Sequence, residues 1–156
     1  MVDPSSSIVV ERTSPRRAEA RALIAELDDY LNRLYAAERN YLLDVEALCA
    51  PEVTFYVARC DDEIAGCGAL RRLDEASAEI KRMYVRPRFR GKGIGRAILL
   101  ALEAQARANG VALLVLETGV DQPEALALYG RHQYVRRAHY GEYRDDPTSV
   151  FFEKRL

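Results

Sequence analysis

Residues 81–96 combine basic and glycine residues in a pattern that predicts an anion-binding site. Seven of these residues are Lys or Arg, none is Asp or Glu, and Gly91, Gly93 and Gly95 alternate near the end. Glycine lets the backbone approach a bound group, and a helix that starts there directs free N–H groups and its positive dipole end toward it. Phosphate suits this arrangement best, although a solvated basic turn would have the same composition.

Familiar nucleotide-binding motifs do not fit this glycine loop. A Walker A loop requires glycine where Arg86 stands and Ser or Thr after Lys92. The dinucleotide pattern G-x-G-x-x-G requires glycine in place of Arg96, although Glu117 stands at a strand end where such proteins bind a ribose. A short-chain dehydrogenase needs Thr-Gly ahead of Gly93 and a Tyr-x-x-x-Lys sequence, and the chain has neither. Nicotinamide and nucleoside triphosphate enzymes are therefore weak alternatives.

Two sequence motifs together fit one known family. Arg90-Gly-Lys-Gly-Ile-Gly95 has the form R-x-x-G-x-G, and Ala125-Leu-Ala-Leu-Tyr129 has the form A-x-x-L-Y on an expected helix. Both resemble the signatures of the GNAT N-acetyltransferase superfamily, and the resemblance covers roughly residues 53–156. The chain departs from it at Gln122, where Asn is frequent, and at Gln133-Tyr134, where Gly-Phe is usual.

The resemblance implies acetyl-CoA as the cosubstrate and assigns residues to hold it. The loop and helix start would bind the pyrophosphate, the preceding strand would pair with the pantetheine and polarise the thioester carbonyl, and Gln122 would contact the cosubstrate or its water. The cofactor-binding residues expected in this way are Met83, Tyr84, Val85, Arg90, Gly91, Lys92, Gly93, Ile94, Gly95, Arg96 and Gln122.

The resemblance also implies two catalytic residues. Tyr129, in the A-x-x-L-Y motif, is the expected general acid, because a phenol with a pKa of about 10 stays protonated at neutral pH and can donate to a leaving thiolate. Glu79 lies eleven positions before Arg90, the spacing of the glutamate base in histone-acetylating members. A water chain, Glu117 or His139 are the alternative bases, and Tyr129 could instead be a packed aromatic residue.

The acceptor is expected beside the N-terminal helices and the C-terminal loop. Residues 26–63 contain ten acidic side chains against three arginines, which suits a cationic amine or, equally, an ordinary solvated helix surface. The candidate substrate-binding residues are Tyr30, Tyr35, Glu38, Glu117 and Tyr143.

The elements that must position these residues follow from hydrophobic spacing and turn residues. The apolar stripe from Leu23 to Leu34 predicts a helix that opens at Ser14-Pro15, and a second helix is expected over 42–48. Strands are expected over 8–12, 53–60, 64–70, 78–85, 112–117, 134–135 and 150–153, and further helices over 94–109 and 123–132. This order predicts an α/β fold with a mixed, mostly antiparallel sheet that contains one β-α-β cofactor unit.

Length and composition complete the prediction. The chain has 156 residues, a formal net charge of -1, three cysteines and two histidines, which favours a single domain over 1–156 and argues against a metal centre. No nucleic-acid or membrane partner is expected, the default location is cytoplasmic, and a homodimer is possible. The expected activity is acetyl transfer to a small primary or amino-acid-like amine. A silent acyl-CoA-binding module and a protein lysine or N-terminal acetyltransferase are the alternatives.

Overall fold

The computed structural model describes residues 7–35 and 43–156. Its centre is a seven-stranded sheet in the order β1-β2-β3-β4-β5-β7-β6. All neighbouring strands are antiparallel except β4 and β5. The strands are β1 (Ile8–Arg12), β2 (Val53–Cys60), β3 (Glu63–Arg72), β4 (Ser77–Val85), β5 (Leu113–Gly119), β6 (Val135–Arg137) and β7 (Ser149–Arg155). This is the mixed α/β architecture that the sequence predicts.

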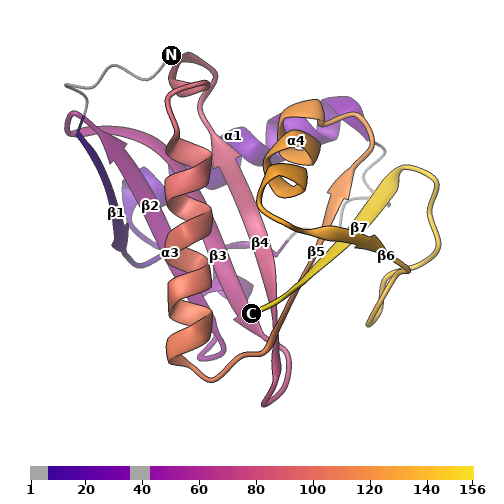
Figure 1. Cartoon of the computed structure of the whole chain (residues 1–156). Coiled ribbons are helices and arrows are strands. Elements are labelled where there is room, and N and C mark those ends of the chain that lie inside the picture. The colour runs from indigo at the N-terminus through magenta and orange to yellow at the C-terminus, as the bar shows by residue number, and fades with distance from the viewer. Residues whose placement is uncertain (1–6, 36–42) are drawn as a thin grey trace.

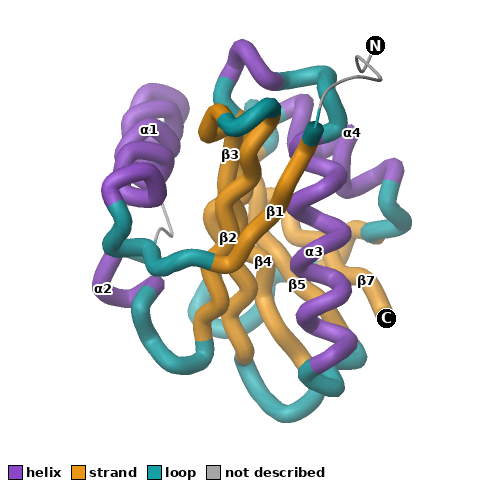
Figure 2. Tube along the Cα trace, turned by 90° about the vertical axis from the view of Figure 1, so that its left-hand side faces the viewer, coloured by secondary structure: helices purple, strands orange, loops and turns teal. Residues whose placement is uncertain are grey.

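Helices cover both faces of the sheet. Helices α1 (Ala18–Leu34) and α2 (Val45–Leu48) lie on one face, and α3 (Ile94–Ala108) and α4 (Pro123–Arg131) lie on the other (Figure 2). One hydrophobic core joins α1 to β2 and β3, and the other joins α3 to the opposite face of the same strands and of β4, β5 and β7. No helix in the described ranges is long and apolar enough to span a membrane.

The parallel pair β4–β5 separates partway along its length. The pairing joins residues 77–80 to residues 113–116, and the two strands diverge beyond it (Figure 1). Within the diverging part, β4 contains a bulge at Arg82, whose φ of 59° lies in the left-handed region. Just beyond this bulge, Gly66 on β3 lets the two strands approach closely, because a Cβ atom there would overlap the carbonyl oxygen of Tyr84. The separation is what opens the sheet for a site.

The element boundaries agree with the prediction to within two residues except near the N-terminus. The first helix begins at Ala18 rather than at Ser14-Pro15. The Ser14 carbonyl accepts the Arg17 N–H and its hydroxyl accepts the Arg16 N–H, so Ser14 caps a turn that precedes the helix. The second helix spans only Val45–Leu48 of the expected 42–48, and residue 42 lies outside the described ranges.

Candidate functional site

A groove of about 520 Å³ runs from the diverging end of β4 to the start of α3. Tyr84 and Val85 of β4 form one wall, and Leu128 and Tyr129 of α4 form another. The lining is largely apolar. Its charged residues are Arg90 and Arg96 at the glycine loop and Glu124 and Arg131 on α4. The groove therefore combines a surface for a long apolar or amide-containing chain with a cationic end.

The glycine loop has the conformation that its sequence predicts. Gly91 and Gly93 adopt φ values of 78° and 85°, which are accessible to glycine without steric cost. The first helical hydrogen bond of α3 runs from the Ala97 N–H to the Gly93 carbonyl, so the N–H groups of residues 94–96 precede it. Arg90 is oriented by donating from Nε to the Val85 carbonyl at 3.1 Å. Dipole, N–H groups and guanidinium together form an anion site.

Most of the Lys and Arg side chains in residues 81–96 form ion pairs within the protein rather than part of the anion site. Four of the seven lie within ion-pair distance of an acid, and the pairs are Lys81–Glu79, Arg82–Asp28, Arg86–Glu26 and Arg88–Glu63. Arg82 is buried and also donates to the Leu43 carbonyl, so it fastens β4 to the α1 face. These ion pairs neutralise three of the ten acidic side chains between residues 26 and 63. The expected strongly acidic acceptor side is therefore weaker than the sequence indicates.

A second hollow lies between the separated ends of β4 and β5 and is also lined by α1. It is called the acceptor cavity, because the acceptor is expected beside the N-terminal helices. It has a volume of about 80 Å³. Its described polar lining residues are Tyr35, Lys81, Arg82, Glu117, Thr118, Gln122, Tyr129 and Thr148. Met83, Gln122 and Tyr129 line the groove as well as this cavity, so the two hollows meet at these residues.

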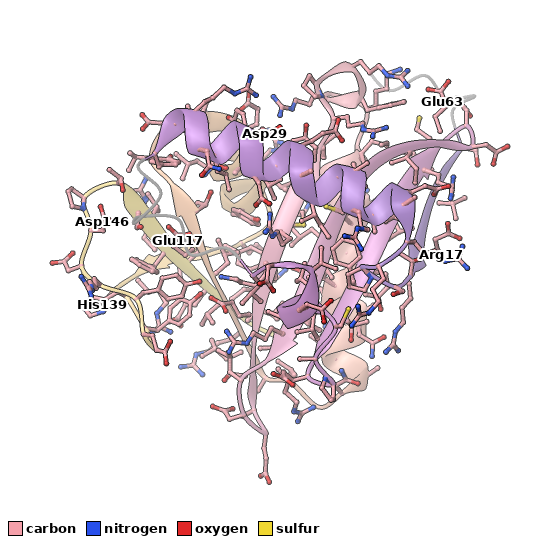
Figure 3. All side chains as sticks on the ribbon, turned by 180° about the vertical axis from the view of Figure 1, so that it is seen from behind. Arg17, Asp29, Glu63, Glu117, His139 and Asp146 are labelled. Atoms are coloured by element: carbon pink, nitrogen blue, oxygen red, sulfur yellow. The ribbon has the colours of Figure 1, made fainter. Side chains whose placement is uncertain are left out.

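Glu117 is the carboxylate of the acceptor cavity. Burial raises its pKa from 4.5 to about 7, while the hydrogen bond from the Ser149 hydroxyl at 2.7 Å and the charge of Lys81 oppose the increase. Figure 3 shows Glu117 between α1 and the C-terminal loop that carries His139 and Asp146. A carboxylate with this pKa can accept and release a proton at neutral pH.

Tyr129 lies at the junction of the two hollows. It is 3% exposed, and its ring packs against Tyr134 and Phe152 with centroid distances of 5.6 and 5.9 Å. Burial and the nearby Glu117 raise the pKa of its hydroxyl above the ordinary value. The phenol is therefore held in its protonated form, as a proton donor must be.

Glu79 does not share this junction. It is 2% exposed, and its Oε2 accepts hydrogen bonds from Tyr140 at 2.5 Å and Tyr143 at 2.6 Å. It is not among the lining residues of the acceptor cavity. Burial and the Glu79 charge raise the pKa of both tyrosine hydroxyls, so they remain donors to this carboxylate. The structure thus brings Glu117, rather than Glu79, to Tyr129.

The remaining candidate substrate residues fall in different places. Tyr35 lines the acceptor cavity, and its hydroxyl accepts the Asp121 N–H at 3.1 Å and hydrogen-bonds Gln122. Tyr30 instead lines the groove, where its ring centroid lies 5.8 Å from the Arg90 guanidinium. Glu38 lies outside the described residues. Tyr143 reaches the cavity through Lys81, whose Nζ donates to its hydroxyl at 2.6 Å.

Two of the cofactor candidates occupy different positions along the site. Gln122 lines both hollows, whereas Lys92 is directed at Phe89, with Nζ 5.8 Å from the ring centroid.

The sequence did not predict Lys81 as a residue of the acceptor cavity. Because side chains alternate along a strand, Lys81 could have been predicted to lie on the same face of β4 as Glu79. The strand separation that opens the cavity beside Lys81 leaves no signal in the local sequence.

Burial makes Cys67 an unsuitable acyl carrier. It is fully buried, its thiol donates to the Arg82 carbonyl at 3.2 Å, and burial raises its pKa to about 12. The thiolate needed for nucleophilic attack is therefore scarce at neutral pH.

Comparisons with known proteins agree on one family. The chain matches the Acetyltransferase (GNAT) family over residues 13–134. It is 44% identical over 151 residues to the IAA acetyltransferase of Azospirillum brasilense, covering 96% of this chain and 99% of that protein.

Solved structures show the same fold. One from Klebsiella pneumoniae subsp. pneumoniae, described as an acyl-CoA N-acyltransferase, is 37% identical with a TM-score of 0.81, covering 96% of this chain and 97% of that one. A GNAT family acetyltransferase from Elizabethkingia anophelis, solved with acetyl-CoA bound, is 20% identical with a TM-score of 0.67, covering 96% and 98%.

Proposed function

Because this chain belongs to the GNAT family of acetyltransferases, we propose that it transfers acetyl from acetyl-CoA directly to the primary amine of a small molecule. The observation that carries the proposal is the junction of the groove and the acceptor cavity at Met83, Gln122 and Tyr129. Acetyl-CoA in the groove and the amine in the acceptor cavity would meet there. Glu117 could accept a proton at this point and Tyr129 could donate one. The small cavity and a relative named IAA acetyltransferase favour a small acceptor over a polypeptide.

The groove fits the chemical parts of acetyl-CoA. The N–H groups at the start of α3, together with Arg90 and Arg96, suit the pyrophosphate, and the apolar length of the groove suits the pantetheine arm. Beyond residue 80, β4 no longer pairs with β5, so its edge can hydrogen-bond the pantetheine amides. Acetyl-CoA supplies the activated acetyl group as a thioester.

Glu117 is the proposed general base and Tyr129 the proposed general acid. Glu117 accepts a proton from the acceptor's ammonium group, which leaves a neutral amine able to form the new C–N bond. The C–S bond breaks as that bond forms, and Tyr129 donates its proton to the departing sulfur. The nitrogen of the new amide then releases the amine's second proton, which restores the Tyr129 hydroxyl. Glu79 has a positioning role, because it holds Tyr140 and Tyr143 of the C-terminal loop against the sheet.

Spectrophotometric measurement of CoA release tests the proposal across a panel of amines, amino acids, polyamines and aminoglycosides. We expect release with at least one small amine and none with a lysine-containing peptide. If acetyl-CoA raised the melting temperature but no acceptor gave release, the chain would be a binding module instead. Stabilisation by NAD(P) without stabilisation by acetyl-CoA would indicate a nicotinamide protein. The cytoplasmic location and the homodimer stay predictions.

A further inference from the structure

Lys81 places an ammonium group in the wall of a cavity that is proposed to receive an amine. Its side chain is only 10% exposed and lines the acceptor cavity together with Glu117. Burial lowers the pKa of Lys81, whereas the charges of Glu79 and Glu117 raise it. Burial of a cation costs free energy unless neighbouring groups stabilise the charge. The groups around Lys81 therefore determine which ligand its ammonium can bind.

Hydrogen bonds fix the orientation of this ammonium. Lys81 Nζ donates to the Tyr143 hydroxyl oxygen at 2.6 Å, and the Tyr143 hydroxyl donates its own proton to Glu79 at 2.6 Å. Because that proton is directed at the carboxylate, the Tyr143 oxygen acts as an acceptor toward Lys81. The C-terminal loop therefore holds Lys81 as a donor at the cavity wall.

The charges around Lys81 favour an anion. Glu79 lies near two cations, with Arg71 Nη1 at 3.9 Å and Lys81 Nζ at 4.0 Å, so the negative charge of this carboxylate is shared between them. Glu117 also attracts Lys81, but this attraction is lost when Glu117 takes up a proton. An acceptor that delivers a proton to Glu117 therefore removes one negative charge from the surroundings of Lys81. A carboxylate on the same acceptor would replace that charge beside Lys81.

We propose that Lys81 binds a carboxylate of the acetyl acceptor, so that the acceptor class is amines that carry an acid group, with α-amino acids the simplest. Such a molecule has its amine and its carboxylate close together, as the cavity has Glu117 and Lys81 on neighbouring strands. The inference rests on the proposed acetyl transfer and adds the charge that selects the acceptor.

The test compares each amino acid with its own C-terminal amide, which keeps the amine and the side chain and removes the carboxylate. We expect the wild-type protein to have kcat/KM for the acid at least about tenfold above that for the amide, as a charge-assisted hydrogen bond provides. Lys81→Met should lower the ratio of kcat/KM for the acid to kcat/KM for the amide roughly 10- to 100-fold. The ratio is the readout because loss of the Lys81 charge also raises the pKa of Glu117 and slows both substrates alike. Lys81→Arg should retain the preference for the acid.

Lys154 provides a matched control. Its side chain is similarly buried, at 14% exposure, and donates to the Glu103 carboxylate at 3.0 Å, but it packs with α3 on the opposite face of the sheet. Lys154→Met should lower the melting temperature without changing the ratio of acid to amide. Acetyl-CoA binding, measured by calorimetry, verifies that each variant is folded.

The outcomes separate the two proposals. Equal turnover of acids and amides by the wild-type protein would overturn carboxylate recognition while leaving acetyl transfer intact. Equal losses for acids and amides in Lys81→Met would assign Lys81 a structural role and overturn the inference too. CoA release from no acceptor would overturn the proposed function, and carboxylate recognition with it.

Discussion

Glu117 and Glu79 lie on neighbouring strands, yet their surroundings give them different chemistry. Hydroxyl groups from two tyrosines and two nearby cations hold Glu79 outside the acceptor cavity, whereas Glu117 lines it with one hydroxyl donor. A sequence spacing identifies a carboxylate of the right type but not its partners. The proposal of Glu117 as the base therefore rests on packing rather than on sequence spacing.

The pKa of Glu117 predicts a specific pH dependence. Because burial raises this pKa to about 7, the proton-accepting carboxylate becomes populated as the pH rises through 7, and kcat/KM should rise over the same range. Glu117→Gln should lower kcat/KM about 100-fold or more and remove that rising limb. A rising limb that persisted in Glu117→Gln would assign the base elsewhere, whereas Glu79→Gln should retain it.

The same shift predicts how stability changes with pH. The folded protein holds the Glu117 proton more tightly than the unfolded chain, where the pKa is 4.5. The stabilisation is therefore complete below pH 4.5 and is lost as the pH rises through 7. Chemical denaturation between pH 4.5 and 8 should show this loss in the wild-type protein, and Glu117→Gln should reduce it.

Tyr129→Phe tests the proposed general acid. Removal of the hydroxyl should lower kcat about 100-fold while the dissociation constant of acetyl-CoA changes less than about twofold. Tyr134→Phe is the control, because Tyr134 packs against Tyr129 but donates its own hydroxyl to Glu103 at 2.8 Å. The control should lose stability and keep its kcat. Equal kcat in Tyr129→Phe and the wild type would remove Tyr129 from the mechanism.

At the level of the elements, the local sequence specifies the glycine loop and the apolar helices and strands well. Loop conformation depends on glycines at fixed positions, and amphipathic spacing depends on neighbouring residues. The bulge at Arg82 brings its side chain to Asp28 and Leu43, and the strand separation after Ile80 depends on the path of β5. All of these partners are distant in sequence from β4. The acceptor cavity forms at these long-range features, so its lining could be predicted only in part.

Gly66 tests the importance of the close approach of β3 to the end of β4 that lines the groove. Gly66→Ala introduces a Cβ that would overlap the Tyr84 carbonyl, so we expect a loss of about 2–3 kcal/mol in the free energy of unfolding and weaker acetyl-CoA binding. Gly130→Ala meets no atom within 4 Å and lies in α4, so it should be neutral or stabilise by up to about 1 kcal/mol. Chemical denaturation compares the pair. Equal stability would show that β3 shifts freely to accommodate the methyl group.

At the scale of the whole molecule, both cores are built on the same strands. The α1 core and the α3 core occupy opposite faces of β2, β3 and β4. Because the two cores share these strands, loss of the strands from one core would also remove them from the other. The predicted single domain over residues 1–156 should accordingly unfold in one transition.

Two core substitutions test this cooperativity. Leu23→Ala in α1 and Leu102→Ala in α3 remove fully buried side chains from different cores, and each should cost about 2–5 kcal/mol. Far-UV circular dichroism and tyrosine fluorescence should report one coincident transition in both variants. Separate transitions would indicate two independently folding layers.

The separation of β4 from β5 also has an evolutionary consequence. The groove is built mainly from residues 83–96 and α4, whereas the far wall of the acceptor cavity comes from Leu31 and Tyr35 at the end of α1, together with Leu43 and Thr148. Substitutions in the second group can alter what is acetylated without disturbing the donor end of the groove. A lineage with this architecture can diversify its substrates by surface-loop and first-helix changes while inheriting one donor site unchanged.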